Sequence, residues 1–212
     1  MTQSFNPFRT LLFFALLLCS ATSFAAGNYV SLALPKSVTV ELPRNWVAIT
    51  KNSRITLDAL VEAKYALNNL PQPVSDLAFG ANLYNDQNKT IAIFNIRYYP
   101  DMEISQADAS AATASDTNDL DNELHKNIME FGPNAGTHVT TWIGTRKTKI
   151  NGFTAFITEY NRAGIGGNKP FRVRLVRIFN EGKSFTITVS YQNDLELMLR
   201  PICDKIIQSI QI

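Results

Sequence analysis

Residues 145–191 carry the clearest structural pattern of the chain, and they read TRKTKINGFTAFITEYNRAGIGGNKPFRVRLVRIFNEGKSFTITVSY. Asn151-Gly152 separates two extended runs, and this pair is typical of a tight β-hairpin turn because both residues tolerate a positive φ. From Ser184 to Tyr191 apolar and polar residues alternate strictly, as they do in a strand with one buried face. The stretch therefore predicts a meander of antiparallel strands.

The residues before this meander predict further strands. Val30–Leu34 and Val38–Leu42 alternate apolar and polar residues, and Trp46–Ile49 is a short extended run. Phe79–Leu83 also alternates, and a polar turn separates it from Thr90–Tyr99, which predicts a hairpin. Because Thr90–Tyr99 carries apolar residues on both faces, we expect it to lie centrally in a sheet that is covered on both sides.

Helical spacing is found in three segments, of which the first runs from Ser53 or Thr56 to about Asn69. The last begins after Asp194, which can cap it, and Cys203 lies beside its apolar stripe as a small buried thiol. The stripe consists of Leu195, Leu199, Ile202 and Ile206.

The middle helical segment begins at Ser105 and Asp108, which have the spacing of a capping box. Its first half is rich in Ala, Ser and Thr, so we expect a weak helix that can break near Ser115. Its second half has an apolar stripe and ends at Gly132-Pro133, a typical stop. The stripe consists of Leu120, Leu124, Ile128 and Phe131.

The order of these elements is strands, helix, hairpin, long helix, meander and helix. A mainly antiparallel sheet with helices on its faces is an α+β fold, in which a central sheet is layered between helices. No segment has the length and composition of a linker between domains, so residues 26–212 are predicted to form a single domain.

Residues 1–25 have the order of a secretory signal peptide. Arg9 precedes an apolar run at 11–18, and small residues follow as far as Ala25. This run is too short to span a bilayer, so we expect cleavage after Ala25 and a periplasmic protein with no stable membrane insertion.

The two cysteines bear on the same interpretation. Lipoprotein signals need a small residue before the lipidated cysteine, and Leu18 precedes Cys19, so we expect Cys19 to leave with the signal peptide. Cys203 is then the remaining cysteine, and no intramolecular disulfide can form.

Charge is distributed unevenly along the chain. The formal net charge is +2, which argues against a nucleic-acid-binding protein. Residues 146–183 hold nine basic residues and two acidic ones, whereas residues 101–130 hold eight acidic residues and one lysine. The basic strands can bind an acidic partner, or they can pair with the acidic helix within the molecule.

Three short motifs stand out along the chain: Val40–Trp46, Ile150–Ala155, and Ser184–Tyr191 leading to a closing helix that ends at Ile206–Ile210. In this order they resemble the PsbP-like family, which includes the photosystem PsbP proteins, the fungal Ran-binding Mog protein and bacterial DcrB-type periplasmic proteins. The resemblance implies a central antiparallel sheet between helical layers, an α/β/α sandwich. It also implies binding or assembly roles more often than catalysis, and it transfers no catalytic residues.

The basic strands supply the candidate partner-binding residues, which are Arg162, Lys169, Arg172 and Arg174. Arg172 and Arg174 share one face of a strand, and the other two flank the loop Gly164–Gly167. Because this loop joins two strands and no helix follows it, we interpret it as a hairpin tip and not as a phosphate-binding loop.

Metal and catalytic patterns are weak. Asp119, Asp121, Glu123 and Glu130 match calcium-hand spacing, but Leu124 stands where glycine is required, so a helix is expected. His125 and His138 lack zinc-ligand spacing. We therefore predict no catalytic residues, no metal site and no cofactor. Trp46 and Trp142 are expected to pack in the core or in a hairpin.

These observations favour an exported, non-catalytic protein that binds an envelope or secreted protein through a face or an edge of its sheet. An assembly or stability factor and an immunity protein against a secreted toxin are the two subclasses. The alternatives are an envelope hydrolase with a dispersed site and a carrier of a small ligand or cation.

Overall fold

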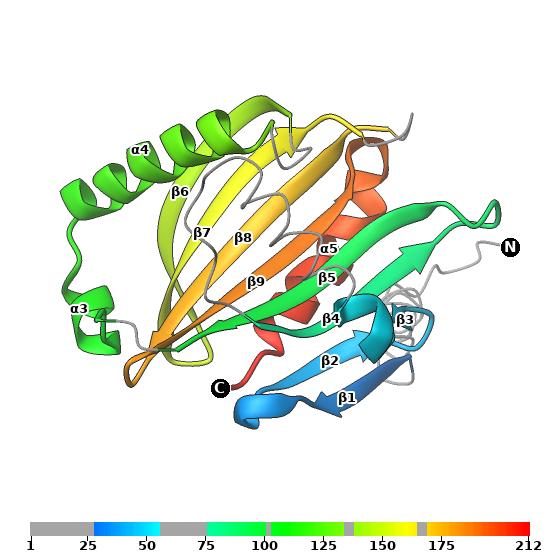
Figure 1. Cartoon of the computed structure of the whole chain (residues 1–212), viewed down its shortest axis with the longest axis horizontal. Helices are drawn as coiled ribbons and strands as arrows, with labels where there is room; N and C mark the ends of the chain where they lie inside the picture. Colours follow the sequence, from blue (N-terminus) through cyan, green and yellow to red (C-terminus); the bar gives the residue numbers. More distant parts are fainter. Residues whose placement is uncertain (1–27, 56–75, 101–102, 134–137, 165–168) are drawn as a thin grey trace, which may run out of the picture.

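The computed structural model describes residues 28–55, 76–100, 103–133, 138–164 and 169–212 (Figure 1). The expected signal peptide at 1–25 lies outside these residues. Most of the helix expected from Ser53 or Thr56 to Asn69 also lies outside them, although residues 51–55 are helical. No helix within the described ranges combines the length and the apolar character needed to cross a membrane.

A seven-stranded antiparallel sheet forms the centre of the described structure, in the order β3-β4-β5-β9-β8-β7-β6. A separate hairpin pairs β1 with β2. The strands are β1 (Tyr29–Ala33), β2 (Thr39–Pro43), β3 (Val47–Ala48), β4 (Asp76–Tyr84), β5 (Thr90–Tyr99), β6 (Val139–Ile150), β7 (Phe153–Arg162), β8 (Phe171–Asn180) and β9 (Lys183–Gln192). The predicted meander is confirmed as β6 to β9, and the predicted central strand as β5.

Two tight turns connect strands of the meander. Asn151 and Gly152 have φ values of 47° and 87°, as a type I′ turn requires, so the hairpin prediction is confirmed. Glu181 and Gly182 join β8 to β9 with φ values of 47° and 72°. Glu181 adopts this left-handed conformation although it has a Cβ. The pairing of β8 with β9 on both sides of the turn stabilises this conformation.

The acidic helical segment consists of two helices, α3 (Gln106–Ala111) and α4 (Ala114–Phe131). The capping box at Ser105 and Asp108 is confirmed, and a second one joins Thr113 to Asp116. The break expected near Ser115 lies at 112–113, because Thr113 adopts an extended conformation and caps the following helix with its side chain.

The C-terminal helix α5 (Glu196–Gln208) follows the short 3-10 helix η2 (Asn193–Leu195). The prediction that Asp194 caps this helix is wrong. The N-cap is Leu195, which has no side-chain capping bond, and the Asp194 carboxylate accepts a hydrogen bond from Lys169 instead. The helix continues through Pro201.

The main hydrophobic core lies between the sheet and α5, which crosses behind β9 and β5 in Figure 1. Cys203 and Trp46 are buried in this core, as expected. The β1–β2 hairpin extends the core, and it is joined to the chain end by two backbone hydrogen bonds between Thr39 and Gln211. On β9 and α5 the buried apolar residues are Phe185, Ile187, Val189, Tyr191, Leu199, Cys203, Ile206 and Ile207.

The opposite face of the sheet carries α3, which contacts β7 and β8, and α4, which runs along β6 in Figure 1. This face is covered less completely than the sequence pattern suggested. Ile93 on β5 faces this side and is half-buried, whereas Phe94 on the α5 side is fully buried. The sheet therefore has one closed face and one that is partly open among the described residues.

Candidate functional site

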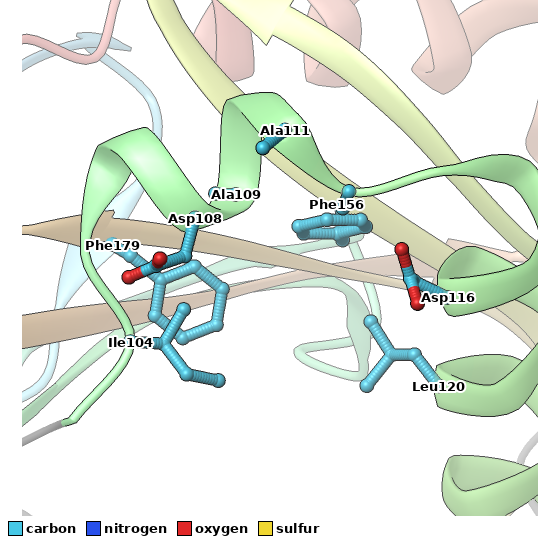
Figure 2. Close-up of a pocket in the computed structure, with 9 residues that line it drawn as sticks. Ile104, Asp108, Ala109, Ala111, Asp116, Leu120, Phe156 and Phe179 are labelled. Atoms are coloured by element: carbon cyan, nitrogen blue, oxygen red, sulfur yellow. The ribbon is translucent and has the colours of Figure 1, made fainter.

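A groove between α3, α4 and the sheet is the candidate functional site. Its floor is formed by Phe156 of β7 and Phe179 of β8, whose ring centroids lie 6.3 Å apart at 71°. Both side chains point toward the helices because their strand neighbours Ile157 and Ile178 point into the α5 core. The cavity measures about 370 Å³, within the range of small ligand pockets (Figure 2).

Hydrogen bonds from Gln106 hold α3 at this end of the sheet. Its side-chain nitrogen donates to the Phe179 carbonyl (2.7 Å), and its Oε1 accepts the Thr154 N–H (2.6 Å). The hydroxyl groups of Ser110 and Thr154 lie 2.8 Å apart. The Gln106 side chain thus bonds to backbone groups at the ends of β7 and β8 where a strand partner would otherwise bond. These bonds fix α3 over the two phenylalanine rings.

The rim of the groove is acidic. Figure 2 shows the carboxylates of Asp108 and Asp116 on opposite sides of the cavity, with the Phe156 ring between them in this view. Hydrogen bonds from Ser105 lower the pKa of Asp108, and hydrogen bonds from Thr113 lower that of Asp116. The capping boxes therefore keep both carboxylates ionised and in place.

A second cavity of about 300 Å³ continues the groove toward β9, since Ile104, Leu120 and Phe179 line both. Arg177 lies in its floor beside Glu123, and burial lowers the pKa of this arginine. The remaining lining residues are Tyr99, Ser184 and Thr186. The groove thus passes from an apolar end to a polar one.

Trp142 of β6 anchors α4 beside this groove. Its ring stacks between His125 (centroids 4.7 Å apart) and Tyr160 (5.7 Å), and its Nε1–H donates to Asp121 at 3.1 Å. The expectation that Trp142 packs within the structure is confirmed. His125 is occupied in the same stack, and the described residues contain no group of three or more potential metal ligands. The calcium-hand candidates at 119–130 lie within the continuous helix α4.

Two of the four predicted partner-binding residues, Arg172 and Arg174, lie on the α5 face and contact carboxylates of this chain. Arg174 is 5 % exposed, with its Nε 3.4 Å from Glu159, and it also pairs with Asp204. Arg172 is 18 % exposed and lies 3.6 Å from both Glu159 and Glu196. The partners of these arginines are thus acids of β7 and α5, and a charge reversal at Arg174 would test folding more than binding.

The other two predicted residues lie elsewhere. Arg162 faces the α3–α4 side, where its guanidinium lies 4.8 Å from the centre of the Phe171 ring. Lys169 pairs with Asp194 before α5. The four side chains therefore do not form one surface. The glycine loop between them is only partly described, and strands β7 and β8 flank it as expected.

The groove residues were not singled out from the sequence, although a signal for two of them was present. Phe156 is next to Ile157 in β7, and Phe179 is next to Ile178 in β8. Because successive side chains of a strand point to opposite faces, the two phenylalanines and the two isoleucines must lie on different faces of the sheet. The two phenylalanines line one groove with Asp108 and Ala109 because of how α3 lies across the strands. No local sequence pattern encodes that placement.

The fold is similar to that of a solved structure, and two others align with lower scores. Cyanobacterial PsbP from Synechocystis sp. PCC 6803 aligns with a TM-score of 0.55 and 13% identity, over 91% of this chain and 97% of that chain. LpqN of Mycobacterium tuberculosis, described as involved in cell envelope biogenesis, aligns with a TM-score of 0.46 and 12% identity, over 86% and 89%. PA94 of Pseudomonas aeruginosa aligns with a TM-score of 0.44 and 13% identity, over 88% of this chain and 98% of that chain.

No family model and no curated protein sequence matches the chain. The similarity to cyanobacterial PsbP concerns the fold, because 13% identity carries no information on function. The chain has a PsbP-like α+β fold, as the resemblance of its motifs implied.

Proposed function

We propose that this chain is a non-catalytic protein of the cell envelope that binds a segment of another protein in the groove between α3, α4 and the sheet. The observation that carries the proposal is the apolar floor at Phe156 and Phe179 beneath an acidic rim. An apolar cavity with a few fixed polar groups is the usual form of a binding site.

The chemistry of the rim favours binding over catalysis. Asp108 and Asp116 have lowered pKa values, so they remain ionised near neutral pH and cannot serve there as proton donors. Each also accepts hydrogen bonds from its own capping residue. Alanine, isoleucine, leucine and phenylalanine supply the rest of the lining of this cavity.

The occupant that fits is a segment with an apolar side chain next to a basic one. The apolar side chain would lie on Phe156 and Phe179, and the basic group would lie near Asp108 or Asp116, which provide opposite charge. The acidic partner considered from the sequence would instead meet the arginines of the α5 face.

The envelope location rests on the signal-peptide pattern at 1–25. Within that compartment the proposal covers an assembly or stability factor and an immunity protein. A neighbouring gene for a secreted toxin would favour the immunity role.

The direct test measures binding of the purified chain to short synthetic peptides in which a leucine is flanked by lysine, by glutamate or by serine. We expect lysine-flanked peptides to bind most tightly. Ala111→Trp places a bulky ring at the exposed rim of the groove and should weaken this binding by about tenfold or more, equivalent to roughly 1.4 kcal/mol.

Ala114→Trp is the matched control, because Ala114 is also exposed and lies outside the cavity lining. It should bind like the unmodified chain. Equal binding by both tryptophan variants, or no preference among the three peptide sets, would contradict the groove as the binding site. Turnover of an envelope substrate that disappears on changing a groove residue would favour the hydrolase alternative.

A further inference from the structure

A separate cavity of about 420 Å³ opens on the α5 side of the sheet and is lined by arginines. Arg146 comes from β6, Arg172 from β8 and Arg200 from α5, and Glu159 of β7 lies among them. The remaining lining residues are Ile143, Gly144 and Thr145. Two strands and a helix thus bring three guanidinium groups to one opening, and a third strand supplies the carboxylate.

Glu159 is the carboxylate shared by the arginines from the strands. Its side chain is 8 % exposed, and its Oε1 accepts a hydrogen bond from Arg146 at 3.0 Å. Arg174 lies beneath the cavity, and its Nε is 3.4 Å from the same oxygen without a well-formed hydrogen bond to a described residue. One carboxylate is therefore contacted by three guanidinium groups, so its single negative charge balances only one of them.

The two other acids of this cluster, Asp204 and Glu196, do not balance the positive charge of the four arginines. Asp204 pairs with Arg174, and Glu196 pairs with Arg172 and with Arg200 (2.9 Å). Four guanidinium groups offer about twenty N–H donors, whereas three carboxylates offer about twelve acceptor positions. The cluster also carries one more positive than negative charge. A group rich in acceptor oxygens and negatively charged would complement it.

Two of the arginines are able to reach such a group. The side chains of Arg146 and Arg200 are 50 % and 47 % exposed, so they meet solvent at the mouth of the cavity. Arg172 is more deeply placed and holds its position through the Asn161 side chain, to which its Nε donates at 2.8 Å. The cavity therefore combines a fixed guanidinium with two accessible ones, an arrangement suited to planar or tetrahedral oxyanions.

We propose that this cavity binds an oxyanion, a carboxylate or a phosphate group, between Arg146, Arg172 and Arg200. The site is separate from the groove, because it lies on the opposite face of the sheet. It also defines where an acidic group of a partner would bind, without requiring Arg162 or Arg174.

The test is titration of the purified chain with succinate and with inorganic phosphate at constant ionic strength, followed by NMR of the arginine Nε–H groups. We expect saturable shifts of arginine signals with at least one of the two anions. Arg146→Gln and Arg200→Gln change half-exposed side chains, and each should weaken binding by about tenfold, because one charge-assisted interaction is lost.

Arg44→Gln is the control, since Arg44 is exposed and lies on the N-terminal hairpin side, and it should leave the titration unchanged. Tighter binding of succinate would identify a carboxylate ligand, and tighter binding of phosphate a phosphorylated one. The absence of saturation with both anions, or equal binding by all three variants, would overturn the proposal. Ala111→Trp should not affect this titration, so it separates this site from the groove.

Discussion

The two faces of the sheet are built by the same strands and have different chemistry. On β9, Ile187 and Val189 face α5 and are fully buried, whereas Thr186 and Thr188 face the other side and are half-buried. The α5 face forms the continuous core, and the α3–α4 face has a small apolar cluster beside a groove. The α5 face supplies the larger apolar core, and the other face combines buried residues such as Phe171 and Val173 with the open groove.

The charges of the two faces differ as well. On the α5 face a buried glutamate contacts three arginines, and these interactions join β7 to its neighbouring strands. On the other face the carboxylates of Asp108 and Asp116 are fixed by their own helix caps at an exposed rim. The same residue types are thus part of the folded core on one side and available to a ligand on the other.

The largest effect on stability should come from removing the negative charge of Glu159 on the α5 face. Glu159→Gln leaves the arginines around it without their shared anion while keeping the side-chain size. We expect a loss of about 3–5 kcal/mol in the free energy of unfolding, measured by urea denaturation. Glu130→Gln on the exposed surface of α4 should change stability by no more than about 0.5 kcal/mol. Similar results for both would show that the network contributes little.

Next in size is a direct comparison of the two faces on one strand. Ile187→Ala should cost about 2–5 kcal/mol, because it removes a fully buried side chain from the core. Thr188→Ala, one residue further on the opposite face, should cost no more than about 0.5 kcal/mol. Both values come from chemical denaturation of the same protein. Equal costs would mean that the second face is as tightly packed as the first.

A smaller effect is expected where α4 is attached to the sheet. Trp142→Phe keeps an aromatic ring between His125 and Tyr160 but removes the hydrogen bond to Asp121, which should cost about 1 kcal/mol. A double-mutant cycle with Asp121→Ala measures the coupling between the two side chains. Fully additive losses would show that this hydrogen bond does not stabilise the helix attachment.

The smallest effect concerns the groove rim and depends on pH. The pKa values of Asp108 and Asp116 are lowered in the folded state, so their stabilising contribution is present above the ordinary value of 3.8. It is lost as the pH falls through the lower pKa values of the folded chain. Melting temperatures recorded from pH 7 downward should therefore decline less steeply in acid for Asp108→Ala/Asp116→Ala than for the unmodified chain. Parallel curves would contradict the role of these caps.

The local elements of this protein could be predicted because their signals are contained in short stretches. Asn151-Gly152 predicted its turn from the φ preferences of two residues, and Ser105 and Asp108 predicted their capping box from spacing alone. The N-cap at Asp194 failed for a tertiary reason. Its carboxylate bonds to Lys169, a residue distant in sequence, and the chain enters α5 through a 3-10 turn instead.

The candidate site was less predictable than the fold. Arg172 and Arg174 were identified as charged side chains on one strand face, but their local sequence does not show that Glu159, Glu196 and Asp204 lie against them. Arg162 was grouped with them because it flanks the glycine loop before β8, and the pleat of the strand places it on the other face.

The sequence alone determined the α+β class, the meander, the Asn151-Gly152 turn and the Ser105–Asp108 cap, because their signals lie in short stretches of neighbouring residues. The tertiary structure decided which face of the sheet is closed and which retains a groove. That choice depends on where α3, α4 and α5 pack, and packing joins side chains that are far apart along the chain. The opening between Phe156, Phe179 and the helix caps exists only through such contacts.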